Sequence, residues 1–287
     1  MKIVVLGAKG QVGSVVFAGL MKTHNVVGTS RSASDALLTF DPFIDDWALL
    51  GKVDTIINCI GQIEPTSTSS FEHVHVGLIK ILLLNRAKIG NPRIVQISAL
   101  GAAVDHRNDF LRTKGIADEL LLKQPDTVIL RPSIVCTHRT TLVRKMLMLS
   151  KIAGYTGMIC LPLRIRQTRI QPVMPGDLAD GIKAVLTPRH ERIINIVGPD
   201  AISVDYLLKQ LITVRHQRLL FLDVPERLMN IFVNQVIARS FPRLINAQQY
   251  ELLHDDNIAD PQPARQLLGR PLESVQNFFI NEFKCQP

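Results

Sequence analysis

The chain has 287 residues, of which 46% are hydrophobic and 20% are charged, and its net charge at pH 7 is +8. This composition is that of a globular protein with one large α/β domain, or one domain and a smaller appendage. No apolar run reaches the ~18 residues of a membrane-spanning helix, which excludes an integral membrane protein by this criterion. The pI near 9.5 indicates an anionic partner: a phosphorylated cofactor or substrate, a nucleic acid or an acidic membrane surface.

The first thirteen residues, MKIVVLGAKGQVG, predict a buried strand that runs into a glycine turn and a helix. The apolar run Ile3 to Leu6 is typical of a strand buried on both faces of a parallel sheet. The GxxGxxG spacing that follows permits a tight turn, close approach to a pyrophosphate and close helix packing. Amides at the start of the helix point at the phosphates. The residues predicted to bind the pyrophosphate are Gly7, Gly10, Gln11, Val12 and Gly13.

The second strand, 24–31, indicates which dinucleotide is bound. A protein that recognises the ribose 2′-hydroxyl of NAD has Asp or Glu at the end of this strand. This chain instead has Thr29, Ser30, Arg31 and Ser32. Arg31 can pair with a 2′-phosphate and the hydroxyls can hydrogen-bond it. We therefore expect NADP rather than NAD as the cofactor, and the alternative is a solvated loop arginine.

The next segments supply further strands of one sheet. A short strand and a helical turn are predicted within 35–52, with Trp47 as a packing residue. The buried strand 53–61 ends at the carboxyl edge of the sheet, beside the cofactor. A helix over 71–87 carries His73 and His75, which do not share a helix face and so predict no metal site. The cofactor-side residues at the end of strand 53–61 are Asn58, Cys59, Ile60 and Gly61.

Two more strands and a helix complete the predicted core. The strand 93–99 places Ser98 where a catalytic hydroxyl lies in this kind of fold. A helix over 108–122 carries Phe110 and Lys114, and the strand 126–135 closes the sheet, with Pro132 marking its exit toward the cofactor edge. The predicted fold class is α/β, a Rossmann-type doubly wound parallel sheet with a smaller, mostly helical C-terminal region.

The predicted boundary lies near residue 135. Residues 1–135 form the NAD(P)-binding core, and 136–287 form an interleaved substrate-side region in which 171–198 returns to the core sheet. Within 171–198, a helix with Asp177 as its cap precedes a strand over 192–198. A lid or interface helix is expected over 228–241. The first strand begins at Lys2 and leaves no room for a leader, so we expect a cytoplasmic protein.

The motifs together resemble those of the short-chain dehydrogenase/reductase superfamily, in its extended and atypical branches. The resemblance covers most of the chain and rests on MKIVVLGAKGQVG, VDTIINCIG, VQISALGA, an FLRTK in the position of YxxxK, and VILRPSIV. The glycine turn is similar to that of sugar-nucleotide reductases and epimerases. The segments SALGA, LRPSIV, IQPVMPGDLADGI and HDDNIADP are most similar to the atypical group that contains the nucleotide-binding accessory subunit of respiratory complex I and related bacterial proteins.

The resemblance implies roles for single residues. Lys114 would hold the nicotinamide ribose hydroxyls, and Ser98 would orient a substrate carbonyl or hydroxyl. In active members a tyrosine whose pKa is lowered by the lysine is the general acid or base, but here that position is Phe110, which has no transferable proton. The resemblance therefore leaves two functions open. One is an NADPH-dependent oxidoreductase or an epimerase/dehydratase-like enzyme, in which His106, Asp105 or Ser98 replaces the tyrosine. The other is a non-catalytic NADPH-binding sensor, scaffold or assembly protein.

The remaining expectations concern partners. The cluster of basic residues between 139 and 169 can face an anionic substrate or an acidic lipid surface, but a solvated basic face over a core stripe is the preferred interpretation. No aromatic and basic interleaving typical of nucleic-acid modules is present, so no nucleic acid is expected. The four cysteines lack metal-ligand spacing, and no metal is predicted. An oligomer is compatible with the sequence. The basic residues of the cluster are Arg139, Arg144, Lys145, Lys151, Arg164, Arg166 and Arg169.

Overall fold

The computed structural model describes residues 1–66, 68–137, 140–187, 191–214, 220–232, 247–276 and 278. The described part divides into two compact units. Unit 1 comprises Met1–Pro132, Pro175–Ile196 and Asp260–Leu272. Unit 2 comprises Ser133–Met174, Val197–Ala259 and the described residues after Leu272. No helix among the described residues is long and apolar enough to cross a membrane.

Unit 1 is built on a seven-stranded sheet in which all neighbouring strands are parallel. The strand order is β3-β2-β1-β4-β5-β6-β9. Successive strands are added on one side of β1 up to β3 and then on its other side from β4 on, which is the doubly wound arrangement expected from the sequence. The strands are β1 (Lys2–Leu6), β2 (Asn25–Ser30), β3 (Leu38–Thr39), β4 (Thr55–Asn58), β5 (Arg93–Ile97), β6 (Thr127–Pro132) and β9 (Ile193–Ile196).

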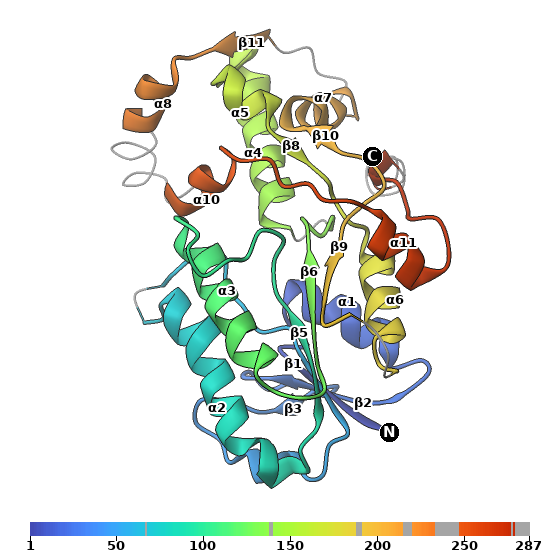
Figure 1. Ribbon diagram of the computed structural model, residues 1–287. Coiled ribbons are helices and arrows are strands. Elements are labelled where there is room, and N and C mark those ends of the chain that lie inside the picture. The colour runs from blue at the N-terminus through green and yellow to red at the C-terminus, as the bar shows by residue number, and fades with distance from the viewer. Residues whose placement is uncertain are drawn as a thin grey trace. The chain divides into compact units, whose positions relative to one another are not determined.

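Helices cover both faces of this sheet (Figure 1), with α1 and α6 on one side and α2 and α3 on the other. The core explains the apolar runs in the sequence, because the β1 and β4 residues lie between the two helical layers and are almost fully buried. Trp47 packs edge-on against Phe40, as expected of a packing residue. The helical elements of unit 1 are α1 (Gln11–Leu20), the 3₁₀ turn η1 (Trp47–Leu50), the π-helical segment η2 (Glu72–Gly77), α2 (Leu78–Asn85), the 3₁₀ turn η3 (Arg86–Ile89), α3 (Asp109–Leu122), α6 (Pro175–Ala184) and α11 (Gln262–Leu268).

Two details of unit 1 differ from the sequence-based expectation. Asp177 is not the cap of α6, because the helix already begins at Pro175 and Asp177 lies in its first turn. Its carboxylate instead pairs with the guanidinium of Arg270 (Nη1 to Oδ1, 2.7 Å). In addition, the segment Asp260–Leu272 belongs to unit 1, where α11 packs on α6 and β9. No motif within 260–272 indicates that this segment packs on unit 1.

Unit 2 has its own apolar core, in which Val143 and Met146 of α4 pack with Leu207 and Leu208 of α7. Two short two-stranded sheets lie in it, β8 with β10 and β7 with β11. Part of the predicted helix 228–241 is α8, and residues 233–246 lie outside the described residues. The elements of unit 2 are α4 (Thr141–Thr156), β7 (Met158–Leu161), α5 (Leu163–Gln167), β8 (Arg169–Ile170), β10 (Ile202–Ser203), α7 (Val204–Val214), β11 (Leu220–Asp223), α8 (Glu226–Phe232) and α10 (Ala247–Leu252).

Candidate functional site

The glycine turn between β1 and α1 is the tightest part of the candidate site. Gly7 has a φ of +76°, which favours glycine, and its carbonyl accepts a hydrogen bond from the Gly10 amide at 2.9 Å. A Cβ at Gly13 would lie 2.1 Å from the Gly7 oxygen, so a side chain there is excluded. The first turn of α1 contains no acidic residue. The turn therefore presents helix amides to an anion, with no carboxylate in that first turn to repel it.

Two cations and two hydroxyls gather at the end of β2. The Lys9 ammonium donates to Ser32 Oγ at 2.8 Å, and Ser30 Oγ lies 3.3 Å from the same oxygen. Arg31 stands between the two serines in the chain and is exposed. Sequence reasoning missed Lys9, although a lysine between the first two glycines of the turn was a visible signal. The group suits a phosphate, since ammonium, guanidinium and hydroxyls all donate hydrogen bonds.

The loop after β4 lies against the glycine turn. A Cβ at Gly7 would lie 2.8 Å from Ile60 Cγ1, so the two loops are in direct contact. Asn58 is buried and shapes this loop: its Nδ2 donates to Gln96 Oε1 at 2.8 Å, and its Oδ1 accepts from the Ile60 amide at 3.0 Å. The structure therefore brings the residues predicted at the end of this strand beside the predicted pyrophosphate turn.

Lys114 of α3 reaches the same edge of the sheet. Its Nζ donates to the carbonyl of Ile97 at 3.0 Å, and a Cβ at Gly61 would lie 3.1 Å from that nitrogen. Burial lowers the pKa of Lys114 to about 8, although the carboxylate of Asp118 and the Cys59 thiol oppose the change. The buried Lys114 amine therefore changes its charge near pH 8.

Ser98 makes a contact that the sequence did not predict. Its hydroxyl donates to Asp118 Oδ2 at 2.8 Å, and the Arg131 guanidinium donates to the same oxygen through Nε at 2.9 Å. Asp118 is fully buried, and this burial raises its pKa against the lowering by Ser98 and Arg131. With its only proton directed at Asp118, the Ser98 hydroxyl can accept a hydrogen bond from a ligand but has none to donate.

Phe110 lies in an aromatic group instead of a proton relay. Its ring meets those of Phe71 and His75 edge-on, with centroid distances of 6.0 and 5.6 Å. Thr113 donates its hydroxyl proton to the Asp109 carbonyl, so its oxygen accepts from His75 Nδ1, 2.8 Å away. His75 Nε2 accepts from the Gln62 amide. Burial, reinforced by the Lys114 charge, lowers the pKa of His75 to about 2, so the ring is neutral. His75 is therefore a buried histidine whose two ring nitrogens both have hydrogen-bond partners.

The other sequence-predicted residues lie as follows. The carbonyl of Pro132 accepts from the Leu100 amide at 2.9 Å and so ties the loop after Ser98 to the end of β6. Asp105 is exposed, and His106 is half-buried in the loop before α3, where its Nδ1 accepts from the Asn108 amide at 3.0 Å. His106 Nε2 therefore carries the proton of the neutral ring.

The basic cluster of unit 2 is largely paired. Arg166 forms an ion pair with Asp205 at 2.8 Å, and Arg169 pairs with Asp256 at 2.7 Å. Lys145 Nζ donates to the side chain of Gln249. These contacts favour a structural role for Lys145, Arg166 and Arg169 over binding of an anionic substrate or lipid. Arg139 lies outside the described residues.

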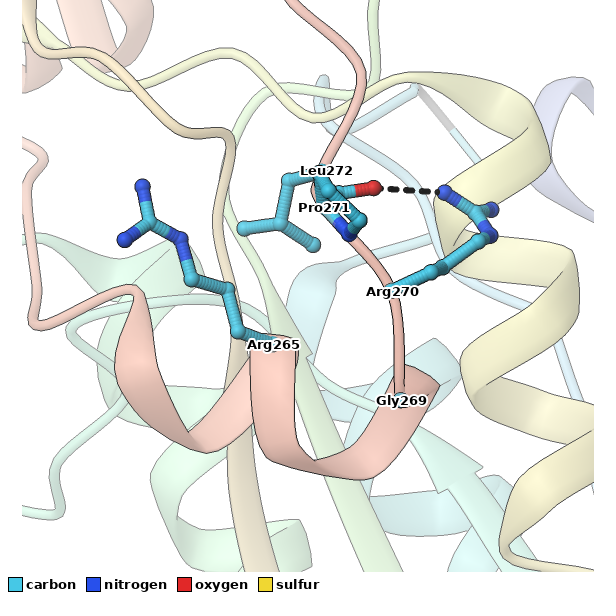
Figure 2. Close-up of a pocket in the computed structure, with 5 residues that line it drawn as sticks. All are labelled: Arg265, Gly269, Arg270, Pro271 and Leu272. Atoms are coloured by element: carbon cyan, nitrogen blue, oxygen red, sulfur yellow. Dashed lines mark hydrogen bonds between the residues drawn. The ribbon is translucent and has the colours of Figure 1, made fainter.

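A hollow lies at the end of α11 in unit 1. Figure 2 shows Arg265 and Arg270 on opposite sides of Pro271 and Leu272, with Gly269 ending the helix. None of the sequence-predicted site residues lines it. The Arg270 guanidinium forms ion pairs with two carboxylates of α6, at 2.6 and 2.7 Å. We therefore assign the hollow to the packing of α11 against α6 and not to a ligand site.

Comparison with known proteins supports the resemblance seen in the motifs. No protein-family model matches the chain. It is 29% identical over 177 residues, or 59% of its length, to NADH dehydrogenase [ubiquinone] 1 alpha subcomplex subunit 9, mitochondrial, of Arabidopsis thaliana. It is 21% identical over 212 residues, or 73% of its length, to the NADH-ubiquinone oxidoreductase 40 kDa subunit, mitochondrial, of Neurospora crassa. The matches span only 43% and 54% of those relatives.

A solved structure with the same fold is UDP-glucuronic acid 4-epimerase from Bacillus cereus, in complex with UDP-glucuronic acid and NAD. It has a TM-score of 0.70 and 16% identity, and the match covers 99% of this chain and 98% of that one. The shared fold confirms the predicted α/β fold class, and the similarity to the two NADH dehydrogenase subunits agrees with the resemblance drawn from the motifs.

Proposed function

We propose that the protein binds NADPH along the carboxyl edge of the unit 1 sheet and holds it as a sensor, scaffold or assembly protein, without the proton transfer of tyrosine-dependent relatives. The observation that carries the cofactor assignment is the group at the end of β2, where Lys9 joins Arg31, Ser30 and Ser32. A 2′-phosphate would find two cations there, while the glycine turn would hold the pyrophosphate. Lys114 would face the nicotinamide ribose, as the resemblance implies.

The observation that carries the second half of the proposal is the state of the residues at the reacting end. Phe110 has no proton to transfer, Ser98 directs its proton at Asp118, and His75 is neutral with both ring nitrogens engaged. A carbonyl substrate needs a donor to its oxygen, and these three groups supply none. The two curated relatives are named as subunits of NADH dehydrogenase (ubiquinone), which supports a role beside other protein chains. Both are named mitochondrial, so the cytoplasmic location stays a prediction.

Calorimetric titration with NADPH and NADH tests the cofactor assignment. We expect NADPH to bind more tightly, and Arg31→Ala or Lys9→Ala to weaken NADPH by about 1.5–3 kcal/mol each while leaving NADH nearly unchanged, because each removes a charge-assisted contact to the 2′-phosphate. Lys22→Ala, which removes an exposed lysine just beyond α1, is the matched control. Tighter binding of NADH, or an unchanged NADPH affinity in both variants, contradicts the assignment.

A second function, turnover with a different acid, is favoured by His106, whose half-buried ring holds a proton on Nε2 near the start of α3. A metabolite screen that follows NADPH absorbance separates the two functions. Rapid oxidation of NADPH by the unaltered protein, lost in His106→Gln, establishes the enzyme. No oxidation by the unaltered protein but slow turnover in Phe110→Tyr supports the binding protein, because that substitution restores the missing proton donor.

A further inference from the structure

The two-stranded sheet of unit 2 has an apolar face exposed to solvent. β7 and β11 are parallel and pair in register, so successive side chains alternate between two faces. On the inner face, Ile159 and Phe221 pack with Ile212. A sheet face that is exposed to water normally carries polar residues. Here the four outward residues form what we call the apolar face: Met158, Cys160, Leu220 and Leu222, all exposed.

Exposed apolar side chains continue on the chain segments that adjoin this face. Tyr155, at the end of α4 and three residues before Met158, is 94% exposed. α8 begins three residues after β11 ends; its Met229 is buried against Ile165 and Tyr250, while Leu228 and Ile231 are more than half exposed. In Figure 1, β11, α5 and the end of α4 gather at one end of unit 2. Soluble proteins seldom leave such residues together in water without a partner.

Two exposed cations stand beside these apolar residues. Lys151 precedes Tyr155 by one helical turn, and Arg227 precedes Leu228. The whole stretch 127–176 contains no Asp or Glu. The carboxylates on α8 and at the end of β11 are paired: Glu226 with Arg164 at 3.8 Å and with His254 at 3.0 Å, and Asp223 with Arg166 at 4.0 Å.

We propose that the apolar face docks the protein on a membrane surface rich in anionic phospholipid. Leucine and methionine side chains would enter the acyl boundary, the tyrosine would lie at headgroup level, and the neighbouring cations would meet lipid phosphates. A nucleic acid would use the cations but leave the leucines and methionine in water. A second copy would bring like charges together across a self-complementary interface, at an electrostatic cost. A lipid surface satisfies both the apolar and the cationic groups.

Vesicle flotation with the full chain tests this surface. We expect the protein to float with vesicles of mixed phosphatidylcholine and phosphatidylglycerol, and much less with phosphatidylcholine alone or at high salt. Leu220→Ser with Leu222→Ser should lower the partition coefficient at least about tenfold. Lys151→Gln should lower it about fivefold. The matched controls are Leu84→Ser, which changes an 81% exposed leucine of unit 1, and Lys123→Gln, which changes an exposed lysine just beyond α3; both should float as the unaltered protein does.

Equal unfolding midpoints in urea and equal far-UV circular dichroism spectra confirm that the leucine variant is folded. Failure of the unaltered protein to float with anionic vesicles overturns the proposal, and so does equal flotation of the leucine variant. Light scattering supplies the competing outcome: a dimer that the leucine variant abolishes would assign the apolar face to a second copy. None of these results depends on the cofactor assignment, since NADPH titration is a separate measurement.

Discussion

The buried Lys114 ammonium should couple NADPH binding to proton uptake. In the free protein its pKa is lowered to about 8 because the nitrogen is buried. An anionic dinucleotide beside it favours the charged form and raises that pKa toward its ordinary value of 10.5. At pH 9 the free amine is mostly neutral and would take up a proton on binding, whereas at pH 7 it is already charged. Between the two pKa values, NADPH affinity should therefore fall as pH rises.

The size of the loss in NADPH affinity follows from the two pKa values of Lys114, about 8 when free and at most 10.5 when the dinucleotide is bound. Affinity can fall by at most about tenfold per pH unit while the free amine is neutral and the bound one charged. If binding restored the ordinary pKa, the whole loss between pH 8 and 10.5 would be about 3 kcal/mol. Because the Lys114 nitrogen stays buried, binding should restore only part of the ordinary pKa, and the measured loss should be smaller than this bound.

Calorimetry at pH 9 in two buffers of different ionisation enthalpy counts the protons taken up. We expect a value approaching one for the unaltered protein and near zero at pH 7. Lys114→Met should remove the uptake, whereas Lys123→Met, which changes an exposed lysine at the end of the same helix, should retain it. The reasoning is refuted if the unaltered protein takes up no proton at pH 9, or if Lys114→Met takes up as much.

Three further predictions concern stability. The His75 pKa is about 2 in the folded chain and 6.5 in the unfolded one, so the unfolded chain binds more protons between these values and stability should fall as pH drops from 6.5; urea midpoints at pH 7 and 4.5 should differ less in His75→Phe than in the unaltered protein. Arg270→Ala leaves the fully buried Asp177 carboxylate without its guanidinium and should cost about 3 kcal/mol in urea unfolding. Arg112→Ala breaks an exposed pair within α3 and should leave the urea midpoint nearly unchanged, and equal losses in the two arginine variants would contradict the argument from burial.

The central sheet could be predicted because its strands carry a local signal. β1, β4 and β6 contain the apolar runs Ile3–Leu6, Ile56–Ile57 and Val128–Leu130, and glycine-containing turns follow β1 and β4. Strands buried on both faces require such runs, so neither pairing nor register had to be known. The cap of α3 was equally local: Asn108 accepts from the Phe110 amide at 3.1 Å and marks the start of the helix.

The parts of the site that sequence reasoning missed depend on contacts between distant residues. Lys9 and Ser32 meet only because β1 and β2 are neighbours, and Ser98 reaches Asp118 only because α3 packs beside β5. Single-residue motifs indicated Ser98 as a hydroxyl for substrate but gave no sign of the carboxylate that takes its proton. Likewise, the exposed face of β7 and β11 depends on a register that a short apolar run does not specify.

These contacts together define what the site can do with a proton. Ser98 and His75 are held by hydrogen bonds that leave them no free donor, and Phe110 never had one. Lys114 is then the group beside the predicted ribose position whose charge changes near neutral pH. An amine with this pKa reports the charge of whatever lies next to it, because a bound anion shifts its protonation without any bond being broken. Such a site would respond to occupancy by the proposed dinucleotide, which is the behaviour expected of a binding protein.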